Sequence, residues 1–154
     1  MTRRILLLTA LAGACALSHA ADNPFVGAWK MNVSKSKSTG ALARSQTRTY
    51  DVDGDWWAVT IEGTEAEWKS TRSSNRYKMD GKDYPWKGSN PQIDTIAATM
   101  PNTRTRVVTT KKGGKVMARQ TLTISKDGRT MTVKGTGTSP DGKPTEFAMV
   151  FEKQ

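Results

Sequence analysis

Apolar and polar residues alternate with a period of two along most of the chain after residue 24, in short runs rich in β-branched and aromatic side chains. The segment 145–152 shows this clearly, because Phe147, Met149 and Phe151 share one face and the residues between them share the other. This is the pattern of strands with one buried face. We predict strands over residues 25–32, 45–52, 55–62, 67–79, 82–86, 92–100, 103–110, 115–125, 129–136 and 145–152.

Short turn-forming dipeptides separate these segments. They are Asp53-Gly54, Asp80-Gly81, Pro101-Asn102, Gly113-Gly114, Asp127-Gly128 and Asp141-Gly142. Such residues suit tight hairpin turns, so successive strands should be antiparallel neighbours. Strands in up-and-down order would leave two exposed edges unless the sheet closes on itself. We therefore predict an all-β fold, namely a single up-and-down antiparallel β-barrel of about 8–10 strands.

Only residues 33–44 break this rhythm. The stretch is polar and weakly periodic, which predicts a loop with at most one helical turn. In a barrel this loop would lie near one mouth. Lys35 and Lys37 could meet an anion there, or they could simply form a solvated basic loop.

The first twenty residues have the features of an export signal. A basic start is followed by an almost wholly apolar run and by Ser18-His19-Ala20, which offers small residues to a signal peptidase. The apolar run is too short to span a bilayer as a mature helix, so no transmembrane segment is expected. We predict a signal peptide over 1–20, a barrel domain over 21–154, and a periplasmic or secreted location.

A lipoprotein is the alternative form of export. Leu11-Ala12-Gly13-Ala14-Cys15 loosely resembles a bacterial lipoprotein cleavage site, although Leu11 stands one position too early. The protein would then be anchored to a membrane through Cys15. Either route takes the barrel domain out of the cytoplasm.

Removal of the signal also limits the available chemistry. The only cysteine, Cys15, and the only histidine, His19, both lie within it. A mature chain without them has no thiol nucleophile, no Ser-His-Asp triad and no thiolate or imidazole zinc site. Asp51, Asp53 and Asp55 alternate as in a calcium loop, but no Glu follows at the required position. We expect no metal and no cofactor.

Charge suggests the kind of partner. The signal removes two of 24 basic residues and none of 14 acidic ones, which leaves 22 against 14 and a net charge of +8. An exported compartment holds little nucleic acid, so nucleic acid is not an expected partner. Anionic envelope lipid or an acidic small ligand fits the charge better. The alternative is that lysines and arginines simply solvate the outer strand faces.

Several strands carry polar or aromatic residues that could line a cavity. Most strands offer only two or three apolar side chains to the interior, so a barrel of this size could keep a partly polar cavity. Adjacent Trp56 and Trp57 must point to opposite faces of their strand. The candidate ligand-binding residues are Arg72, Arg76, Arg104, Arg106, Tyr77 and Trp57.

Catalytic candidates are fewer. Glu67, Asp83 and Tyr84 could carry a proton, as carboxylates and phenols do in enzymes without histidine. Their spacing does not fix a pair of groups across a substrate. Turn-forming, solvated acids are the alternative interpretation of the same residues.

The segment Phe25-Val26-Gly27-Ala28-Trp29-Lys30-Met31 carries a family resemblance. It resembles the first strand of fatty-acid-binding proteins, Phe-x-Gly-Thr-Trp-Lys-Leu, and its Gly-x-Trp is also the first-strand signature of lipocalins. The ending Val150-Phe151-Glu152-Lys153 is similar to the last strand of fatty-acid-binding proteins. The resemblance implies a calycin barrel, with Trp29 packed near its base and a small apolar ligand inside.

A second resemblance covers nearly the whole mature chain. Gly-x-Trp-Lys-x-Asn-x-x-Lys-Ser-Lys, at residues 27–37, is similar to a group of exported bacterial proteins of unassigned function. The same group shares Tyr-Lys-Met-Asp-Gly-Lys-Asp-Tyr-Pro at 77–85 and Ser-Lys-Asp-Gly at 125–128.

Departures from the families bear on function. Fatty-acid-binding proteins hold the ligand carboxylate with Arg-x-Tyr in the last strand, where this chain has Met149 and Phe151. Lipocalins place an arginine on the base tryptophan, for which this chain offers only Lys143 and Lys153. The resemblance therefore implies the fold more strongly than the fatty-acid site.

Two functions remain open. The first is an exported barrel that holds a small hydrophobic or amphipathic molecule, including an anionic one. The alternative is a cofactor-free isomerase, cyclase or lyase on the same barrel, with Tyr or Asp/Glu as the proton carrier. The sequence leaves the ligand and the oligomeric state open.

Overall fold

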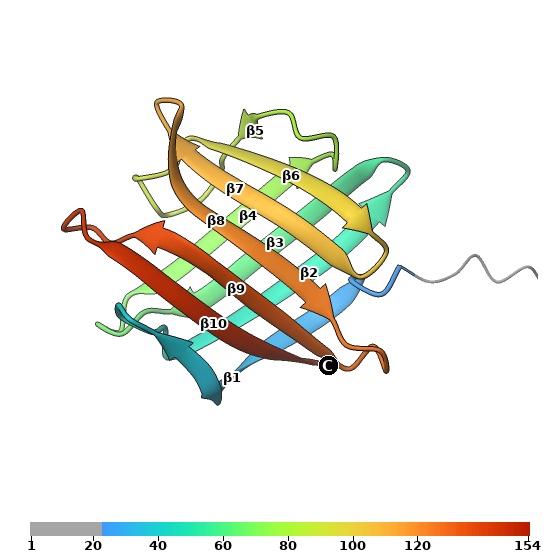
Figure 1. Cartoon of the computed structure of the whole chain (residues 1–154), viewed down its shortest axis with the longest axis horizontal. Helices are drawn as coiled ribbons and strands as arrows, with labels where there is room; N and C mark the ends of the chain where they lie inside the picture. Colours follow the sequence, from blue (N-terminus) through green and yellow to red (C-terminus); the bar gives the residue numbers. More distant parts are fainter. Residues whose placement is uncertain (1–22) are drawn as a thin grey trace, which may run out of the picture.

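A computed structural model describes residues 23–154 as one antiparallel sheet that wraps into a barrel (Figure 1). Its strands are β1 (Gly27–Ser38), β2 (Ser45–Asp53), β3 (Trp56–Thr64), β4 (Ser70–Tyr77), β5 (Tyr84–Pro85), β6 (Thr95–Asn102), β7 (Thr105–Lys112), β8 (Lys115–Ile124), β9 (Thr130–Thr138) and β10 (Pro144–Lys153). The predicted signal segment, with Cys15 and His19, lies outside the described residues. Within 23–154 no helix is long and apolar enough to cross a membrane.

The strand order explains how the sheet closes. It runs β4-β3-β2-β1-β10-β9-β8-β7-β6-β5, so every neighbour is a hairpin partner except β1 and β10. Trp29 of β1 lies opposite Arg48 of β2 on one side and Lys153 of β10 on the other. In Figure 1 the red β10 and the blue β1 meet at the lower edge of the barrel. The predicted all-β, up-and-down antiparallel barrel is confirmed.

The loop predicted over residues 33–44 is wrong for its first half, because β1 continues to Ser38. The pairing of β1 with β10 shifts between Asn32 and Lys37, as at a β-bulge. Buried Ser36 bridges the irregularity: its hydroxyl donates to the Asn32 carbonyl at 2.7 Å and accepts from the Val150 amide at 3.0 Å. The Ser36 side chain thus takes the place of backbone hydrogen bonds between the strands. Because Ser36 is polar, residues 33–38 lack the alternation of apolar and polar residues by which a strand is predicted.

Other strand boundaries also differ from the prediction. Pro101 and Asn102 belong to β6, and the turn that follows lies at Thr103 and Arg104. The strand predicted from residue 67 begins only at Ser70, after a turn closed by the Glu65 amide donating to the Lys69 carbonyl at 2.9 Å.

One end of the barrel is filled by a tightly packed aromatic and aliphatic core around Trp29. Trp29 is fully buried, and its indole N–H donates to the Phe25 carbonyl at 2.8 Å. The Lys153 ammonium lies 5.3 Å from the centre of the Trp29 ring. Lys153 thus occupies the cationic place that the lipocalin resemblance assigns to an arginine, while Lys143 pairs with Asp141.

The sheet is weakest between β4 and β5. Two segments cross this seam. The segment 86–89 bonds to β4, since the Ser74 amide donates to the Lys87 carbonyl at 3.0 Å and the Ser89 amide to the Arg72 carbonyl at 2.9 Å. Beyond the end of β4, the Gly81 amide donates to the Ala98 carbonyl of β6 at 2.9 Å. A Cβ atom on Gly88 would lie 2.6 Å from the Cβ of Ser73 and 2.9 Å from the Trp86 ring. Gly88 therefore allows the segment to approach β4 closely enough to close the barrel.

We expect Gly88→Ala to loosen the seam without unfolding the barrel. The added methyl group forces the segment away from β4, and overpacking of this kind costs about 1–3 kcal/mol. Amide hydrogen exchange of Ser74 and Ser89 should therefore become about 10- to 100-fold faster, because each 1.4 kcal/mol corresponds to about a factor of ten. The Lys153 amide, which donates to the Arg129 carbonyl at the end of the central β9–β10 pair, is the control and should not change. Equal protection in both proteins would contradict this account of Gly88.

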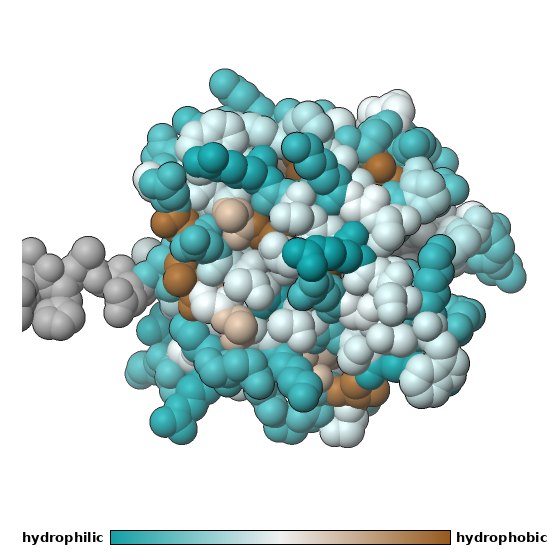
Figure 2. Space-filling model, turned by 180° about the vertical axis from the view of Figure 1, so that it is seen from behind, coloured by the Kyte–Doolittle hydropathy of each residue, from teal (hydrophilic) through white to brown (hydrophobic). Residues whose placement is uncertain are grey.

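The outer surface is mostly hydrophilic. Figure 2, which views the molecule from behind, shows hydrophobic residues scattered among polar ones on that face. The large exposed hydrophobic residues of the described part are Val33, Trp68 and Val116. Trp68 lies under the Arg44 guanidinium, 4.0 Å from the ring centre. The sheet thus has its apolar face turned inward.

Candidate functional site

A small, partly open cavity lies inside the barrel. Its volume is about 150 Å³, and its walls come from both halves of the sheet. Apolar side chains line much of it, and the lining residues with polar atoms in their side chains are Arg48, Tyr50, Asn75, Tyr77, Trp86, Arg106, Thr110 and Gln120. The expected partly polar interior is therefore present, and it is small.

Arg106 is the most unusual residue of this cavity. It alternates with Val108 and Thr110 on the inward face of β7, and its side chain is fully buried. Its Nη2 donates to the Tyr77 hydroxyl at 2.9 Å, while Nε and Nη1 have no hydrogen-bond partner. An arginine carries five N–H donors and is always charged, so most of its donors remain unused.

No acidic group compensates this charge. Among residues 23–154, no carboxylate oxygen lies within 4.0 Å of a side-chain nitrogen of Arg106 or of Arg48. Buried charges in proteins are normally paired, since the desolvation of an unpaired ion costs several kcal/mol. The interior of the barrel therefore carries uncompensated positive charge.

Aromatic rings supply part of the missing stabilisation. The guanidinium carbon of Arg106 lies 4.4 Å from the centre of the Trp57 ring and 4.9 Å from that of Tyr50. Phe25 and Tyr77 lie slightly further away, at 5.3 and 6.0 Å. Ring faces attract a cation, but they do not provide the oxygen acceptors that its N–H groups prefer. The arrangement can therefore hold a guanidinium while leaving it free to bind an anion.

A second buried arginine is held differently. Arg48 of β2 donates from Nε to Gln46 at 2.8 Å and from Nη1 to Gln120 at 3.4 Å, and its guanidinium lies 4.8 Å from the centre of the Phe151 ring. Both amide partners are neutral. Arg48 adds to the positive potential of the cavity but is better satisfied than Arg106.

Two further donors of the cavity have no partner. The indole N–H of Trp86 and the hydroxyl of Thr110 are both buried and unbonded. The Oδ1 atom of Asp94 is also buried and unbonded, but Asp94 does not line the cavity, and its Oδ2 accepts from the Gly113 amide at 2.7 Å. The cavity thus offers donors from Arg106, Trp86 and Thr110 and lacks acceptors for them.

Burial sets the ionisation of Tyr77. Desolvation raises the pKa of its hydroxyl above the ordinary value, and the nearby Arg106 charge opposes that rise. Tyr77 is therefore neutral at physiological pH. It accepts the Arg106 hydrogen bond without neutralising the charge.

The raised pKa of Tyr77 predicts a loss of stability in alkali. A group that binds its proton more tightly when folded stabilises the fold below its unfolded pKa, about 10 for tyrosine, and loses that contribution as pH rises through the folded pKa. We expect the free energy of unfolding of the parent protein, minus that of Tyr77→Phe, to stay constant up to about pH 9 and to fall above about pH 10. Urea unfolding at each pH measures both values. A difference that is independent of pH would contradict the assignment.

Of the six predicted ligand-binding residues, three lie at the barrel interior. Arg106 and Tyr77 line the cavity, and Trp57 packs against Arg106. The inward orientation expected for Arg72, Arg76 and Arg104 is wrong, because all three are exposed.

The three exposed arginines have partners at the surface. Arg72 pairs with Glu62, Arg76 with Asp53, and Arg104 donates to the Ser125 carbonyl. The first two alternate on β4 with the inward residues Ser73, Asn75 and Tyr77, so they lie on the outer face. Any contact that they make with a ligand would therefore be at the outer surface.

The candidate catalytic residues do not come together. Glu67 is exposed in the turn between β3 and β4, whereas Tyr84 packs against Trp56 at the opposite end of that hairpin. Asp83 pairs with Lys111 at 2.8 Å, and the Tyr84 hydroxyl donates to Asp80 at 3.0 Å. These contacts use the groups in surface interactions. Within residues 23–154 no three His, Cys, Asp or Glu side chains are placed to hold a metal ion.

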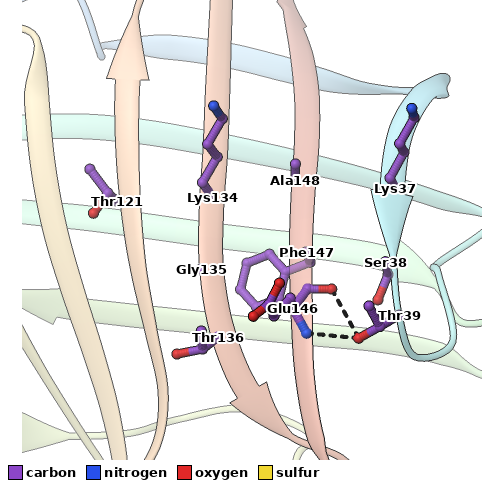
Figure 3. A pocket seen from close by; sticks show the side chains of 10 residues that line it. All are labelled: Lys37, Ser38, Thr39, Thr121, Lys134, Gly135, Thr136, Glu146, Phe147 and Ala148. Carbon is purple, nitrogen blue, oxygen red and sulfur yellow. Dashed lines mark hydrogen bonds between the residues drawn. The ribbon is translucent and has the colours of Figure 1, made fainter.

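A larger hollow lies on the outside of the barrel. It has a volume of about 700 Å³ and is lined by residues of β1, β8, β9 and β10. Figure 3 shows Lys37 and Lys134 pointing the same way on either side of Ala148, with Thr39 bonded to the backbone of Glu146. None of its lining residues has a buried polar side-chain atom without a partner. We therefore regard the interior cavity as the better candidate site.

Sequence reasoning missed Arg48, Trp86 and Thr110 as cavity residues. Arg48 could have been found, because it alternates with Tyr50 and Val52 on the same face of a predicted strand. Trp86 could not, since it follows the two-residue β5 and its direction depends on how the segment 86–89 meets β4.

The fold and this interior cavity define a single antiparallel barrel of the lipocalin and fatty-acid-binding type. A zebrafish ileal bile acid-binding protein, solved in complex with cholic acid, has a similar structure, with a TM-score of 0.50 and 14% sequence identity over 85% of this chain and 99% of that one. No family model matches the chain, and no curated protein does.

Other similar structures have lower scores. The redesigned barrel mFAP1, bound to DFHBI, gives a TM-score of 0.46 and 12% identity over 85% of this chain and 96% of that one. Lobster apocrustacyanin A1 gives 0.42 and 13%, over 87% and 63%. The lipocalin-like barrel fold expected from Gly27 and Trp29 is confirmed, and the bile acid-binding protein has a similar fold. The resemblance to the exported bacterial group stays a prediction.

Proposed function

We propose that this protein is exported and binds a small hydrophobic or amphipathic anion inside its barrel. The observation that carries the proposal is Arg106, a fully buried cation with two unbonded nitrogens and no acidic neighbour among the described residues. An anion bound there would supply both the missing charge and the missing acceptors. The apolar walls of the cavity would bury the rest of the molecule.

Other features agree with this proposal. The similar ileal bile acid-binding protein was solved with cholic acid, which is itself an acid. A net charge of +8 after signal removal would also attract an anion toward the protein. Anionic envelope lipid remains a further candidate partner, through the surface charge rather than the cavity.

The bound molecule can be sought directly. The full-length gene is expressed with its own signal, the protein is purified from the periplasm without denaturation, and its mass is measured under native and then denaturing conditions. We expect a mature protein that begins at Ala21 and a native mass greater than the denatured mass by one small acid. Organic extraction then identifies that acid.

Two results would count against the proposal. Retention of the first twenty residues in a cytoplasmic product would refute export. Equal native and denatured masses, together with no binding of any carboxylate from short to long chain, would refute ligand binding. A mature mass that begins at a lipid-modified Cys15 would support export by the alternative route.

A further inference from the structure

Resting on the proposed function, we infer the class of ligand: a compact monocarboxylate whose body is about the size of one benzene ring. Its carboxylate binds Arg106, and an oxygen at its other end accepts from Trp86 or Thr110. Such a ligand is smaller than a long-chain lipid, and unlike a neutral apolar molecule it carries a negative charge.

The size follows from the cavity. Its volume of about 150 Å³ lies below the range of about 300–1,000 Å³ that is typical of small-molecule pockets. An apolar cavity of about 150 Å³ is known to hold one benzene molecule. Inward side chains of Val59, Ile61, Ile96, Val108 and Leu122 line this space. An extended chain of sixteen carbons would have to displace several of them.

The charge follows from the difference between the two arginines. Arg48 has two neutral amide partners, whereas the Nε and Nη1 atoms of Arg106 have none. One open guanidinium matches one carboxylate, which can accept at both of its oxygens. A doubly charged phosphate would leave one charge uncompensated, because Arg48 already bonds two amides and the other free donors, Trp86 and Thr110, are neutral.

The second polar end follows from the geometry of β7. Arg106 and Thr110 lie four residues apart on one face of the strand, about 13 Å along it, and the Arg106 guanidinium lies against the rings of Trp57 and Phe25. The unbonded Thr110 hydroxyl and Trp86 indole N–H therefore mark a different part of the cavity from the guanidinium. A benzene ring that carries a carboxylate and, on the opposite carbon, a hydroxyl would present the carboxylate to Arg106 and the hydroxyl to Trp86 and Thr110.

The test compares four molecules by isothermal titration calorimetry on the mature protein, after bound ligand has been removed. Benzoate and 4-hydroxybenzoate should bind with one molecule per protein, and 4-hydroxybenzoate should bind more tightly. Benzamide, which has the same shape without the charge, should bind about 10- to 100-fold more weakly, since hydrogen bonds to charged groups are the stronger ones. Hexadecanoate should not displace benzoate.

Variants locate the two ends of the ligand. Arg106→Met should reduce benzoate affinity by about 10- to 100-fold, whereas Arg76→Met, a matched change on the outer surface, should not. The double variant Trp86→Phe/Thr110→Val should remove the advantage of 4-hydroxybenzoate over benzoate and leave benzoate itself nearly unchanged. An advantage that persists would overturn the second polar end. If Arg106→Met fails to fold, the comparison of benzoate with benzamide on the parent protein still tests the charge.

The outcomes separate this inference from the proposed function. Displacement of benzoate by hexadecanoate at equal or higher affinity would overturn the compact ligand while leaving a binding barrel. Equal affinity for benzoate and benzamide would overturn the carboxylate. No binding by any of the four, with a native protein that carries no small acid, would overturn both.

Discussion

The double variant Arg106→Met/Tyr77→Phe is expected to be more stable than the parent protein when no ligand is present, by about 1–4 kcal/mol. It replaces a buried, uncompensated charge and its only hydrogen-bond partner with apolar groups of similar size. Methionine also packs well against aromatic rings, which here are those of Trp57 and Tyr50. The gain in stability should come with a loss of carboxylate binding.

Urea unfolding of the two ligand-free proteins measures this change. Changing both residues matters, because Arg106→Met alone would leave the buried Tyr77 hydroxyl without its partner, at a cost of about 1–3 kcal/mol. Arg76→Met is the surface control and should stay within about 0.5 kcal/mol. A loss of 3 kcal/mol or more in the double variant would mean that the arginine-aromatic contacts hold the fold together, and Arg106 would then be structural.

The second large effect is expected from Trp29→Ala, which should destabilise the barrel by about 3–5 kcal/mol. Trp29 is fully buried, donates to the Phe25 carbonyl and carries the Lys153 ammonium on its ring. It lies on β1, between its partner strands β2 and β10, so the cavity left behind opens at the centre of the sheet, where the first and last strands of the chain pair.

Trp68→Ala is the matched control for this loss. Trp68 is 72% exposed and touches mainly Arg44, so its removal should change stability by no more than about 0.5 kcal/mol. Chemical unfolding, followed by the fluorescence of the remaining tryptophans, measures the free energy of unfolding of both variants. Similar losses of stability in Trp29→Ala and Trp68→Ala would contradict the conclusion that Trp29 stabilises the base of the barrel.

The fold could be predicted because its determinants are local. Alternation on β10 places Phe147, Met149 and Phe151 on one face, and glycines at turns such as Gly128 have the positive φ angles that tight hairpins use. In part of β1 the hydroxyl of Ser36 makes hydrogen bonds that backbone groups make elsewhere in the sheet. The alternation of apolar and polar residues is lost there, so the strand could not be predicted.

The site was only partly predictable, because alternation gives the face of a residue only when the strand register is known. Arg106 and Tyr77 were found with the exposed Arg72, Arg76 and Arg104, and sequence alone did not separate the two groups. The absence of an acid beside Arg106 is a property of strands distant in sequence, and so is the small size of the cavity. Both emerge only when the barrel is closed.

Nuclear magnetic resonance of the arginine side chains tests the central claim most directly. The Nε–H signal of Arg106 is assigned by its absence in Arg106→Met, and 4-hydroxybenzoate is then added to the ¹⁵N-arginine-labelled parent protein. We predict a saturable shift of the Arg106 signal, with the signals of Arg72 and Arg76 unchanged. A constant Arg106 signal, with shifts confined to the surface arginines, would show that the anion binds outside the barrel and would contradict the account.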